Sequence, residues 1–357
     1  MADLFGKSAL TPEWVERFQD LSKLNAYAAN QPVHLANVTL TGWDISGAKL
    51  PDARFEDTEW KDVKLERGVL SNVTFKKSKL QGVEFDHGVL TDVTFEDTEL
   101  RSTSFYKAKL QRVRFIRCKL NGVNVDETVE STIEITDSKL VSSSLSEGQL
   151  VATVKNSTLK DIEFTDLESP SSLAFEKSEL NEANFGRSIL EQLTFIDSKI
   201  VESGGSGAVI DRFTVTRTAL DFGLAESRFK NIVISGSTLK ALGLGNNQIQ
   251  ELEISDCTQF DDLGLYETKL GSLKINRCTV KGLRPRSATI DLWSVKDSQI
   301  ANSKFEGMKV KTATLENVTL DKELNFTNAR IDQLVAKNIT KLPGLNLITT
   351  GSNVKFE

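Results

Sequence analysis

Histidine, cysteine, methionine and proline are all scarce in this chain. Of its 357 residues, two are His, three are Cys, two are Met and six are Pro. His34 and His87 are too few for a multi-histidine metal site or relay. Three cysteines far apart do not make a disulfide framework, which favours a reducing compartment. The sequence therefore predicts a cytoplasmic protein without a metal or other cofactor.

Long apolar runs and a strong excess of one charge are also missing. No run approaches 18 apolar residues, so no membrane span is predicted. The N-terminus has no basic region followed by an apolar stretch, so it does not read as a secretory signal. The chain carries 44 Lys and Arg against 50 Asp and Glu, a net charge of −6. This mild acidity argues against direct binding of nucleic acid.

What the sequence does contain is a regular recurrence of apolar residues, with a period of five residues. Every fifth residue from Leu35 to Val125 is apolar, nineteen positions in succession. Five matches neither the 3.6-residue period of a helix nor the two-residue period of a strand. It matches a chain that turns a corner every five residues, so that four sides make a square coil of 20 residues. The central residue of each side then points into the core.

The residue two positions before each central residue should also point inward, because side chains alternate along a strand. In the segment 93–100, VTFEDTEL, Val precedes Phe and Thr precedes Leu. Larger and smaller residues nearly alternate at this second position from Val63 to Val123. Pairing Val with Phe and a small residue with Leu keeps the core volume constant from coil to coil, as close packing requires.

This pattern resembles the pentapeptide-repeat family. The best matches to its Ala-(Asp/Asn)-Leu-X-X consensus are SGAKLPDARF (Ser46 to Phe55) and NEANFGRSIL (Asn181 to Leu190). The resemblance covers residues 33 to 335. It implies an all-β solenoid, a right-handed quadrilateral β-helix, here with an N-terminal capping α-helix. We therefore predict a repeat domain over residues 33–340.

Interruptions of the period predict where the coils are irregular. Glu130 falls on an inward position and marks the first irregular corner. Three segments shift the phase and are predicted to be outward loops, at residues 167–172, 203–207 and 284–287. Because these slips lie between regular blocks, we expect one continuous rod of about sixteen coils, roughly 75 Å long at strand spacing.

Both ends of a stacked array need caps. In residues 1–32, Thr11 reads as an N-cap before Pro12. Trp14, Phe18, Leu21 and Leu24 then recur at helical spacing, which predicts one helix over about residues 12–29. Residues 341–357 are predicted to be a C-terminal cap or a homodimer contact.

Candidate catalytic chemistry is hard to find in this sequence. Cys118, Cys257 and Cys278 stand where other repeats have Ser, so they are interpreted as small inward residues. The glycine-rich SGGSG of residues 203–207 lacks the Lys-Ser/Thr of a phosphate-binding loop. Neither histidine belongs to a recognisable triad, and no pair of carboxylates stands out. We therefore predict no enzyme, with no catalytic, cofactor-binding or metal residues.

Acidic residues are concentrated in the middle of the sequence. Residues 126–200 carry 6 basic and 15 acidic side chains, whereas residues 31–125 carry 15 and 13. This excess favours a docking surface for a basic protein partner. The candidate residues are Glu127, Glu134, Asp137, Glu147, Asp161, Glu163, Asp166, Glu168, Glu176, Glu179 and Glu182.

Three hypotheses for function follow. The first is a non-enzymatic scaffold that presents side chains at fixed spacing to a protein partner. The second comes from the family resemblance, since some pentapeptide-repeat proteins mimic a DNA duplex and bind DNA gyrase or another type II topoisomerase. The third, also from the resemblance, is an effector or adaptor of a bacterial secretion system, which would need no cleavable signal.

Overall fold

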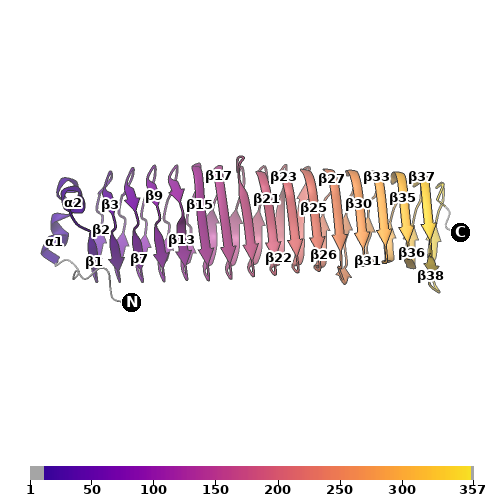
Figure 1. The fold of residues 1–357 in the computed structure, drawn as a ribbon, viewed down its shortest axis with the longest axis horizontal. Coiled ribbons are helices and arrows are strands. Elements are labelled where there is room, and N and C mark those ends of the chain that lie inside the picture. Colours follow the sequence, from indigo (N-terminus) through magenta and orange to yellow (C-terminus); the bar gives the residue numbers. More distant parts are fainter. Residues whose placement is uncertain (1–11, 355–357) are drawn as a thin grey trace. The chain divides into compact units, whose positions relative to one another are not determined.

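The computed structural model describes residues 12–354. The chain divides into two compact units, unit 1 (Met1–Leu173) and unit 2 (Ala174–Glu357). Each unit is a stack of coils in which short strands pair in parallel with the equivalent strands of the next coil (Figure 1). The predicted fold class, a right-handed all-β solenoid with a small N-terminal helical cap, is confirmed. The continuous rod stays a prediction.

Unit 1 contains three parallel sheets. The first consists of β1 (His34–Ala36), β4 (Arg54–Glu56), β7 (Thr74–Lys76), β10 (Thr94–Glu96), β13 (Val113–Ile116), β15 (Thr128–Thr136) and β17 (Gly148–Lys155). The second consists of β2 (Thr39–Thr41), β5 (Glu59–Lys61), β8 (Lys79–Gln81), β11 (Glu99–Arg101), β14 (Lys119–Asn121), β16 (Lys139–Ser144) and β18 (Thr158–Glu163). The third consists of β3 (Lys49–Pro51), β6 (Val69–Ser71), β9 (Val89–Thr91) and β12 (Lys109–Gln111). A row of single bridges from Asp44 to Ser144 forms the fourth side.

The corners of unit 1 are made by residues with positive φ. From Asn37 to Glu127 every fifth residue has φ between 47° and 81°. Asp, Asn and Gly tolerate this left-handed conformation best, and they occupy every corner from Asn37 to Asp62. His87 lies at such a corner, with φ 56°. The five-residue period is therefore a period of corners as well as of core residues.

The core of unit 1 is a pair of phenylalanine stacks. All nineteen predicted central residues are at most 3% exposed. Phe75, Phe95 and Phe115 lie on successive coils, with ring centroids 5.0 Å apart and planes within 8°. Phe85 and Phe105 stack in the same way at 5.0 Å. Such offset aromatic contacts add to the stabilisation from burial.

Small polar residues form a second inward row in both units. In unit 1, the backbone N–H of Thr58 donates to the Ser78 hydroxyl on the next coil, 3.2 Å away. Cys118 takes the same slot, where its N–H donates to the Ser138 hydroxyl. Cys118, Cys257 and Cys278 are all at most 3% exposed, which confirms that they are small inward residues.

Glu130 corrects one prediction. It is exposed and has φ 48°, and its carboxylate pairs with Lys109 at 2.7 Å. The pairing of β15 with β17 shifts register between Thr128 and Ser131, so Ser131 takes the inward place beside Leu150. A bulge thus turns the charged residue outward, because burying an unpaired carboxylate would be costly.

The N-terminal cap consists of two short helices, α1 (Pro12–Arg17) and α2 (Leu21–Ala28), where one was predicted. Asp20 separates them, because its backbone is extended and its carboxylate accepts the N–H of Ser22 at 3.0 Å. Thr11 and the Trp14 side chain lie outside the described part of the structure. From α2, the Asn25 side chain accepts the N–H of Lys49, which occupies the open edge of β3.

Unit 2 has two main sheets; β19 (Ser172–Glu176) lies at the boundary of the units. The first sheet consists of β21 (Ile189–Ile196), β23 (Val209–Thr216), β25 (Arg228–Ser235), β27 (Gln248–Ser255), β30 (Lys269–Asn276), β33 (Thr289–Lys296), β35 (Lys309–Glu316) and β37 (Arg330–Lys337). The second consists of β20 (Glu179–Asn184), β22 (Lys199–Ser206), β24 (Ala219–Ala225), β26 (Thr238–Gly243), β28 (Gln259–Phe260), β29 (Leu263–Gly264), β31 (Thr279–Lys281), β32 (Leu283–Arg284), β34 (Gln299–Lys304), β36 (Thr319–Asn325), β38 (Thr340–Lys341) and β39 (Asn346–Ile348).

One corner of the coil is straightened in unit 2. The eight-residue strands of its first sheet run through the position where Asn72 and Asp92 make a corner in unit 1. The equivalent residues Arg212, Asn231 and Glu251 do not have positive φ. Coil length also varies, since Val209 pairs with Arg228 nineteen residues on, and Gln248 pairs with Lys269 twenty-one residues on.

One of the three predicted loops in the repeat domain is wrong. Residues 203–206 belong to strand β22, where a Cβ on Gly204 would collide with the carbonyl oxygen of Gly223. These glycines therefore permit a close approach of strands and do not form a flexible loop. Residues 284–287 make an ordinary corner after β32, with Ser287 at φ 55°. Residues 167–171 lie in the connection between β18 and β19, and Ser172 begins β19.

The C-terminal end of unit 2 is only partly covered. The short strands β38 and β39 both pair with β36 in the second sheet. In the first sheet, β37 pairs with β35, and no strand within residues 12–354 pairs with its other edge. Val335 on β37 is 60% exposed.

Candidate binding groove

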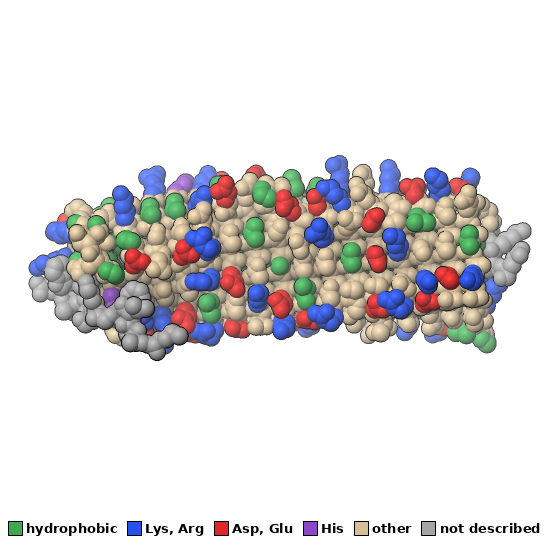
Figure 2. All heavy atoms as spheres, in the orientation of Figure 1, with side chains coloured by type: hydrophobic (Ala, Val, Ile, Leu, Met, Phe, Trp, Pro, Cys, Tyr) green, Lys and Arg blue, Asp and Glu red, His purple; other side chains and the backbone are tan. Residues whose placement is uncertain are grey.

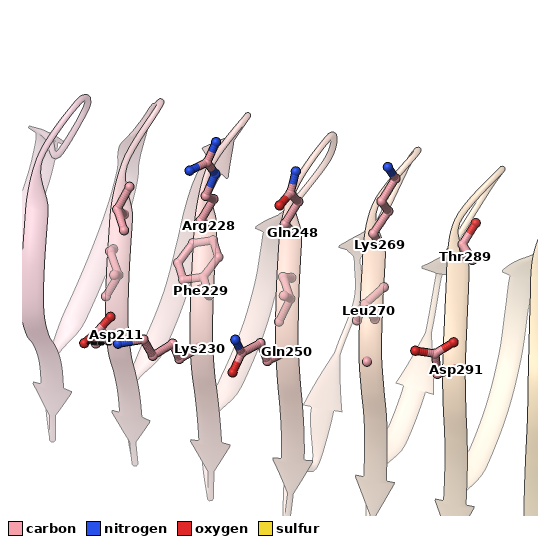
Figure 3. Close-up of a pocket in the computed structure, with 14 residues that line it drawn as sticks. Asp211, Arg228, Phe229, Lys230, Gln248, Gln250, Lys269, Leu270, Thr289 and Asp291 are labelled. Carbon is pink, nitrogen blue, oxygen red and sulfur yellow. Dashed lines mark hydrogen bonds and ion pairs between the residues drawn. The ribbon is translucent and has the colours of Figure 1, made fainter.

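A groove of about 650 Å³ runs across the outer surface of unit 2. It crosses the first residues of five successive strands, β23, β25, β27, β30 and β33 (Figure 3). Its floor is the line of inward-pointing residues Ile210, Phe229, Ile249 and Leu270. Because residues on either side of an inward residue point outward in a strand, two parallel rows of side chains border the groove.

The two rows form the two rims of the groove. The first rim consists of Val209, Arg228, Gln248, Lys269 and Thr289, which are direct neighbours in the parallel register. The second rim consists of Asp211, Lys230, Gln250, Gly271 and Asp291. In Figure 3 the side chains of Arg228, Gln248 and Lys269 follow one another along the first rim.

The charges of the two rims differ. On the second rim, the Lys230 ammonium pairs with the Asp211 carboxylate at 2.5 Å. On the first rim, Arg228 and Lys269 form no ion pair with any residue in the described part of the chain. The groove therefore offers two unpaired cations on one side, and an ion pair together with the Asp291 carboxylate on the other.

Gly271 lowers the second rim between Gln250 and Asp291. A Cβ at this position would lie 2.6 Å from the Gln250 carbonyl oxygen, so the adjacent backbones approach too closely for a side chain. Between Gln250 and Asp291 the second rim has no side chain. The groove is thus open on that side opposite Lys269.

The structure does not gather the predicted acidic residues on one face. Glu127, Glu147 and Asp166 lie on successive coils of one corner row. Glu134 lies on β15, Asp137 at the next corner of the chain, and Glu163 on β18. Asp161 accepts the Ser142 hydroxyl, and Glu168 follows β18. In unit 2, Glu176, Glu179 and Glu182 occupy three different positions of the coil. Figure 2 likewise shows acidic and basic side chains interspersed over the visible face.

Basic side chains also offset part of this acidity. Lys107 lies 3.0 Å from the Glu127 carboxylate, and the Tyr106 hydroxyl donates to the same group at 2.6 Å. Hydrogen bonds from Tyr106 and Lys107 lower the pKa of Glu127. Those with Tyr106 and Glu127 raise the pKa of Lys107 to about 12. Glu127 is therefore part of a local charge cluster.

Sequence reasoning missed the groove. It treated outward residues as a solvated surface and looked for charge in sequence segments. The row of basic residues appears only when equivalent positions of successive coils are compared. Arg228, Lys269 and Lys309 then fall in a single outward row. The register changes of 19 to 21 residues hide that row from a search with a fixed period.

The described residues hold little else that could do chemistry. Burial raises the pKa of the Cys118 thiol to about 11, which keeps it protonated and unreactive at neutral pH. Among residues 12–354, no group of three or more His, Cys, Asp or Glu side chains could hold a metal ion. No helix in this range is long and apolar enough to cross a membrane.

Comparison with known proteins agrees with this architecture. The family model for pentapeptide repeats matches residues 89–126, in eight copies. This chain contains pentapeptide repeats. The match lies within the regular coils of unit 1, where the five-residue period is uninterrupted. No curated protein matches the chain in sequence.

Several solved structures are similar to the chain. QnrB1, a plasmid-mediated fluoroquinolone resistance protein, is 15% identical, with a TM-score of 0.31 over 66% of this chain and 91% of QnrB1. HetL, a pentapeptide repeat protein involved in heterocyst differentiation regulation from the cyanobacterium Nostoc sp. strain PCC 7120, is 13% identical, with a TM-score of 0.20 over 92% and 95%. The mannuronan C-5 epimerase AlgE6 A-module of Azotobacter vinelandii is 11% identical, with a TM-score of 0.27 over 94% and 96%. At these values the similarities carry no argument about function.

Proposed function

We propose that this protein is a non-enzymatic scaffold, and that a protein partner binds it along the groove of unit 2. The groove is the observation that carries the proposal. It spans five coils and is open along its length, and its rims present polar groups at the spacing of parallel strands. An elongated open surface suits a protein segment better than a small molecule, which is usually enclosed by its pocket.

The chemistry of the groove supports binding over catalysis. A nucleophile normally needs a base within hydrogen-bond reach. The groove contains neither His nor Cys. Of its two carboxylates, Asp211 is held in an ion pair with Lys230, and Asp291 lies on the rim opposite Thr289. Its remaining groups are donors and acceptors that recognise a surface.

A second, smaller contact is proposed in unit 1, at the corner row of Glu127, Glu147 and Asp166. These are the three predicted acidic residues that lie on successive coils. DNA mimicry would need a longer acidic face, and the scattered positions of the other eight acids do not favour it. Binding of a topoisomerase, a role in secretion and the cellular location stay predictions.

A homodimer contact is proposed at the open edge of β37. An unpaired strand edge is a ready template for pairing with another strand. Two copies joined at this edge would also cover Leu334, which is in register with the buried Ala313 but is itself only half-buried. Light scattering should then show a dimer for the wild-type chain and a monomer for Leu334→Lys, whose charge would be buried in the contact. A monomeric wild type would contradict this proposal.

The test of the scaffold is quantitative capture of prey from a lysate of the source organism. Arg228→Glu/Lys269→Glu should lose the specific prey. Lys281→Glu/Lys304→Glu, with the same charge change on the second sheet of unit 2, should retain it. Equal capture by both variants would reject the groove as the site. Enrichment of a type II topoisomerase that is lost when Glu127, Glu147 and Asp166 are neutralised would favour DNA mimicry instead.

A further inference from the structure

The cations of the first rim recur with a regular spacing. Arg228, Lys269 and Lys309 lie on β25, β30 and β35, which are every second strand of the sheet. All three side chains are exposed, and none pairs with an acidic residue within residues 12–354. These three residues, called the basic row below, extend the first rim one coil beyond Thr289. An anionic partner would meet a positive charge at every second coil.

The spacing of the basic row selects the conformation of a peptide. Parallel strands lie about 4.8 Å apart, so two coils span about 9.6 Å. A polyproline II helix repeats every three residues and rises 3.1 Å per residue, about 9.3 Å per turn. Over the whole row the mismatch is under about 1 Å, which lysine side chains absorb. A β-strand repeats its face every two residues, about 6.7 Å, and cannot place an acid at every cation.

The residues between the cations fit the backbone of such a peptide. Gln248 lies on the first rim and Gln250 on the second (Figure 3). Between them in the sequence is Ile249, which belongs to the floor. Polyproline II has no internal hydrogen bonds, so its carbonyl groups need external donors. The two amide side chains supply donors from both rims. Asp291 on the second rim repels carboxylates and directs them towards the basic row.

We propose that the groove and basic row bind an acidic peptide in the polyproline II conformation, with a carboxylate at every third residue. The carboxylates pair with Arg228, Lys269 and Lys309, and the peptide backbone lies between the two glutamines. The proposal rests on the proposed function, since it names the partner class for the same groove. It adds that the partner contributes a segment of the form E-x-x-E-x-x-E, rich in proline.

The test uses a fluorescein-labelled peptide, EPPEPPEPP, titrated with the full chain and followed by fluorescence anisotropy at low salt. The spacing control EPEPEPPPP has the same composition, and both sequences favour polyproline II because most residues are or precede proline. We expect EPPEPPEPP to bind at least about fivefold more tightly, since only it places all three carboxylates on the cations. Equal affinity for the two peptides would overturn the spacing argument.

Variants test the individual contacts. Each of Arg228→Glu, Lys269→Glu and Lys309→Glu should weaken binding of EPPEPPEPP by about five- to tenfold, because an attraction becomes a repulsion. Lys281→Glu and Lys304→Glu carry the same charge change elsewhere on unit 2 and should leave the affinity within twofold. Circular dichroism checks that each variant keeps its strand content. Equal losses for both sets would show nonspecific attraction and reject the proposal.

Two further outcomes separate this inference from the scaffold proposal. If an oligothymidine of similar length competes as well as EPPEPPEPP, the row binds polyanions in general and the peptide assignment is wrong. If neither peptide binds, but captured prey is still lost with Arg228→Glu/Lys269→Glu, the groove is the site and only the partner chemistry fails. If capture fails as well, the scaffold proposal fails with it.

Discussion

Units 1 and 2 use one period to build two different coils. From residue 34 to 125, unit 1 turns four corners per coil, and its strands are mostly three residues long. Unit 2 straightens the corner at the positions of Arg212, Asn231 and Glu251, and its strands there are eight residues long. The groove lies across the first halves of these long strands.

The order of large and small core residues also differs between many of these coils. Unit 1 has Val93 before Phe95, whereas unit 2 has Phe213 before Val215 and Leu252 before Ile254, all buried. A large side chain just after the corner position needs space that a tight corner does not leave, because interiors are close-packed. The comparison teaches that the period alone does not decide whether the chain turns. The position of the bulky residue is one contribution, since β35 runs straight although the small Ala313 precedes Leu315.

The largest predicted effect is on the phenylalanine stack of unit 1. Phe95→Ala should lower the free energy of unfolding by about 3–5 kcal/mol, because it leaves a cavity between Phe75 and Phe115. Denaturant unfolding monitors the loss. Phe95→Leu is the control and should cost much less. A loss under about 1 kcal/mol for the alanine variant would show that the stack is not essential to the coil.

Changing the size of one core side chain should affect the stability of the two units differently. Val93→Leu should destabilise unit 1 by about 1–3 kcal/mol, because the four-cornered coil has no room for the longer side chain. The reverse change in unit 2, Leu252→Val, should cost about 1 kcal/mol as a small cavity. Amide hydrogen exchange, followed residue by residue, measures the stability of each unit separately. A stabilising effect of Val93→Leu would contradict the volume explanation.

Two equivalent asparagines test the corner directly. Asn72 has φ 56°, whereas Asn231 at the same position of the coil in unit 2 does not have positive φ. Asn72→Val should cost about 1–2 kcal/mol, since a left-handed conformation is unfavourable for residues with a branched Cβ. Asn231→Val should be neutral or stabilising, since valine favours strands. Equal effects in thermal unfolding would mean that both positions have one conformation.

The smallest expected difference concerns the ion pairs between coils, which both units share. Hydrogen bonds from Arg117 lower the pKa of Asp97, and those from Arg217 lower the pKa of Asp197. A lowered folded-state pKa gives stability above the unfolded pKa, about 3.9, that is lost as pH falls through the folded value.

Arg117→Gln should therefore raise the pKa of Asp97 towards its ordinary range and move the acid loss of stability to higher pH. An NMR titration of the Asp97 carboxyl carbon measures this, with Asp197 as the internal reference. An unchanged pKa of Asp97 would show that the pair is not formed in solution.

The sequence could predict which residues point into the core, but little of how the outward residues are arranged. The period from Leu35 to Val125 places every core residue, since a buried position accepts few residue types. The charged Glu130 and the glycines at 203–207 were misplaced, because a bulge and a close strand approach depend on neighbouring coils. The basic row depends on register between coils of unequal length, so it required the structure.

Photo-crosslinking from the groove tests the central claim most directly. A photoreactive residue at Gln248, expressed in the source organism, should crosslink to one protein partner. The same residue at Val89, an exposed first-rim equivalent in unit 1, should not. The Gln248 crosslink should disappear in Arg228→Glu/Lys269→Glu. Crosslinks of equal yield at both positions, or none at Gln248, would contradict a protein-binding groove confined to unit 2.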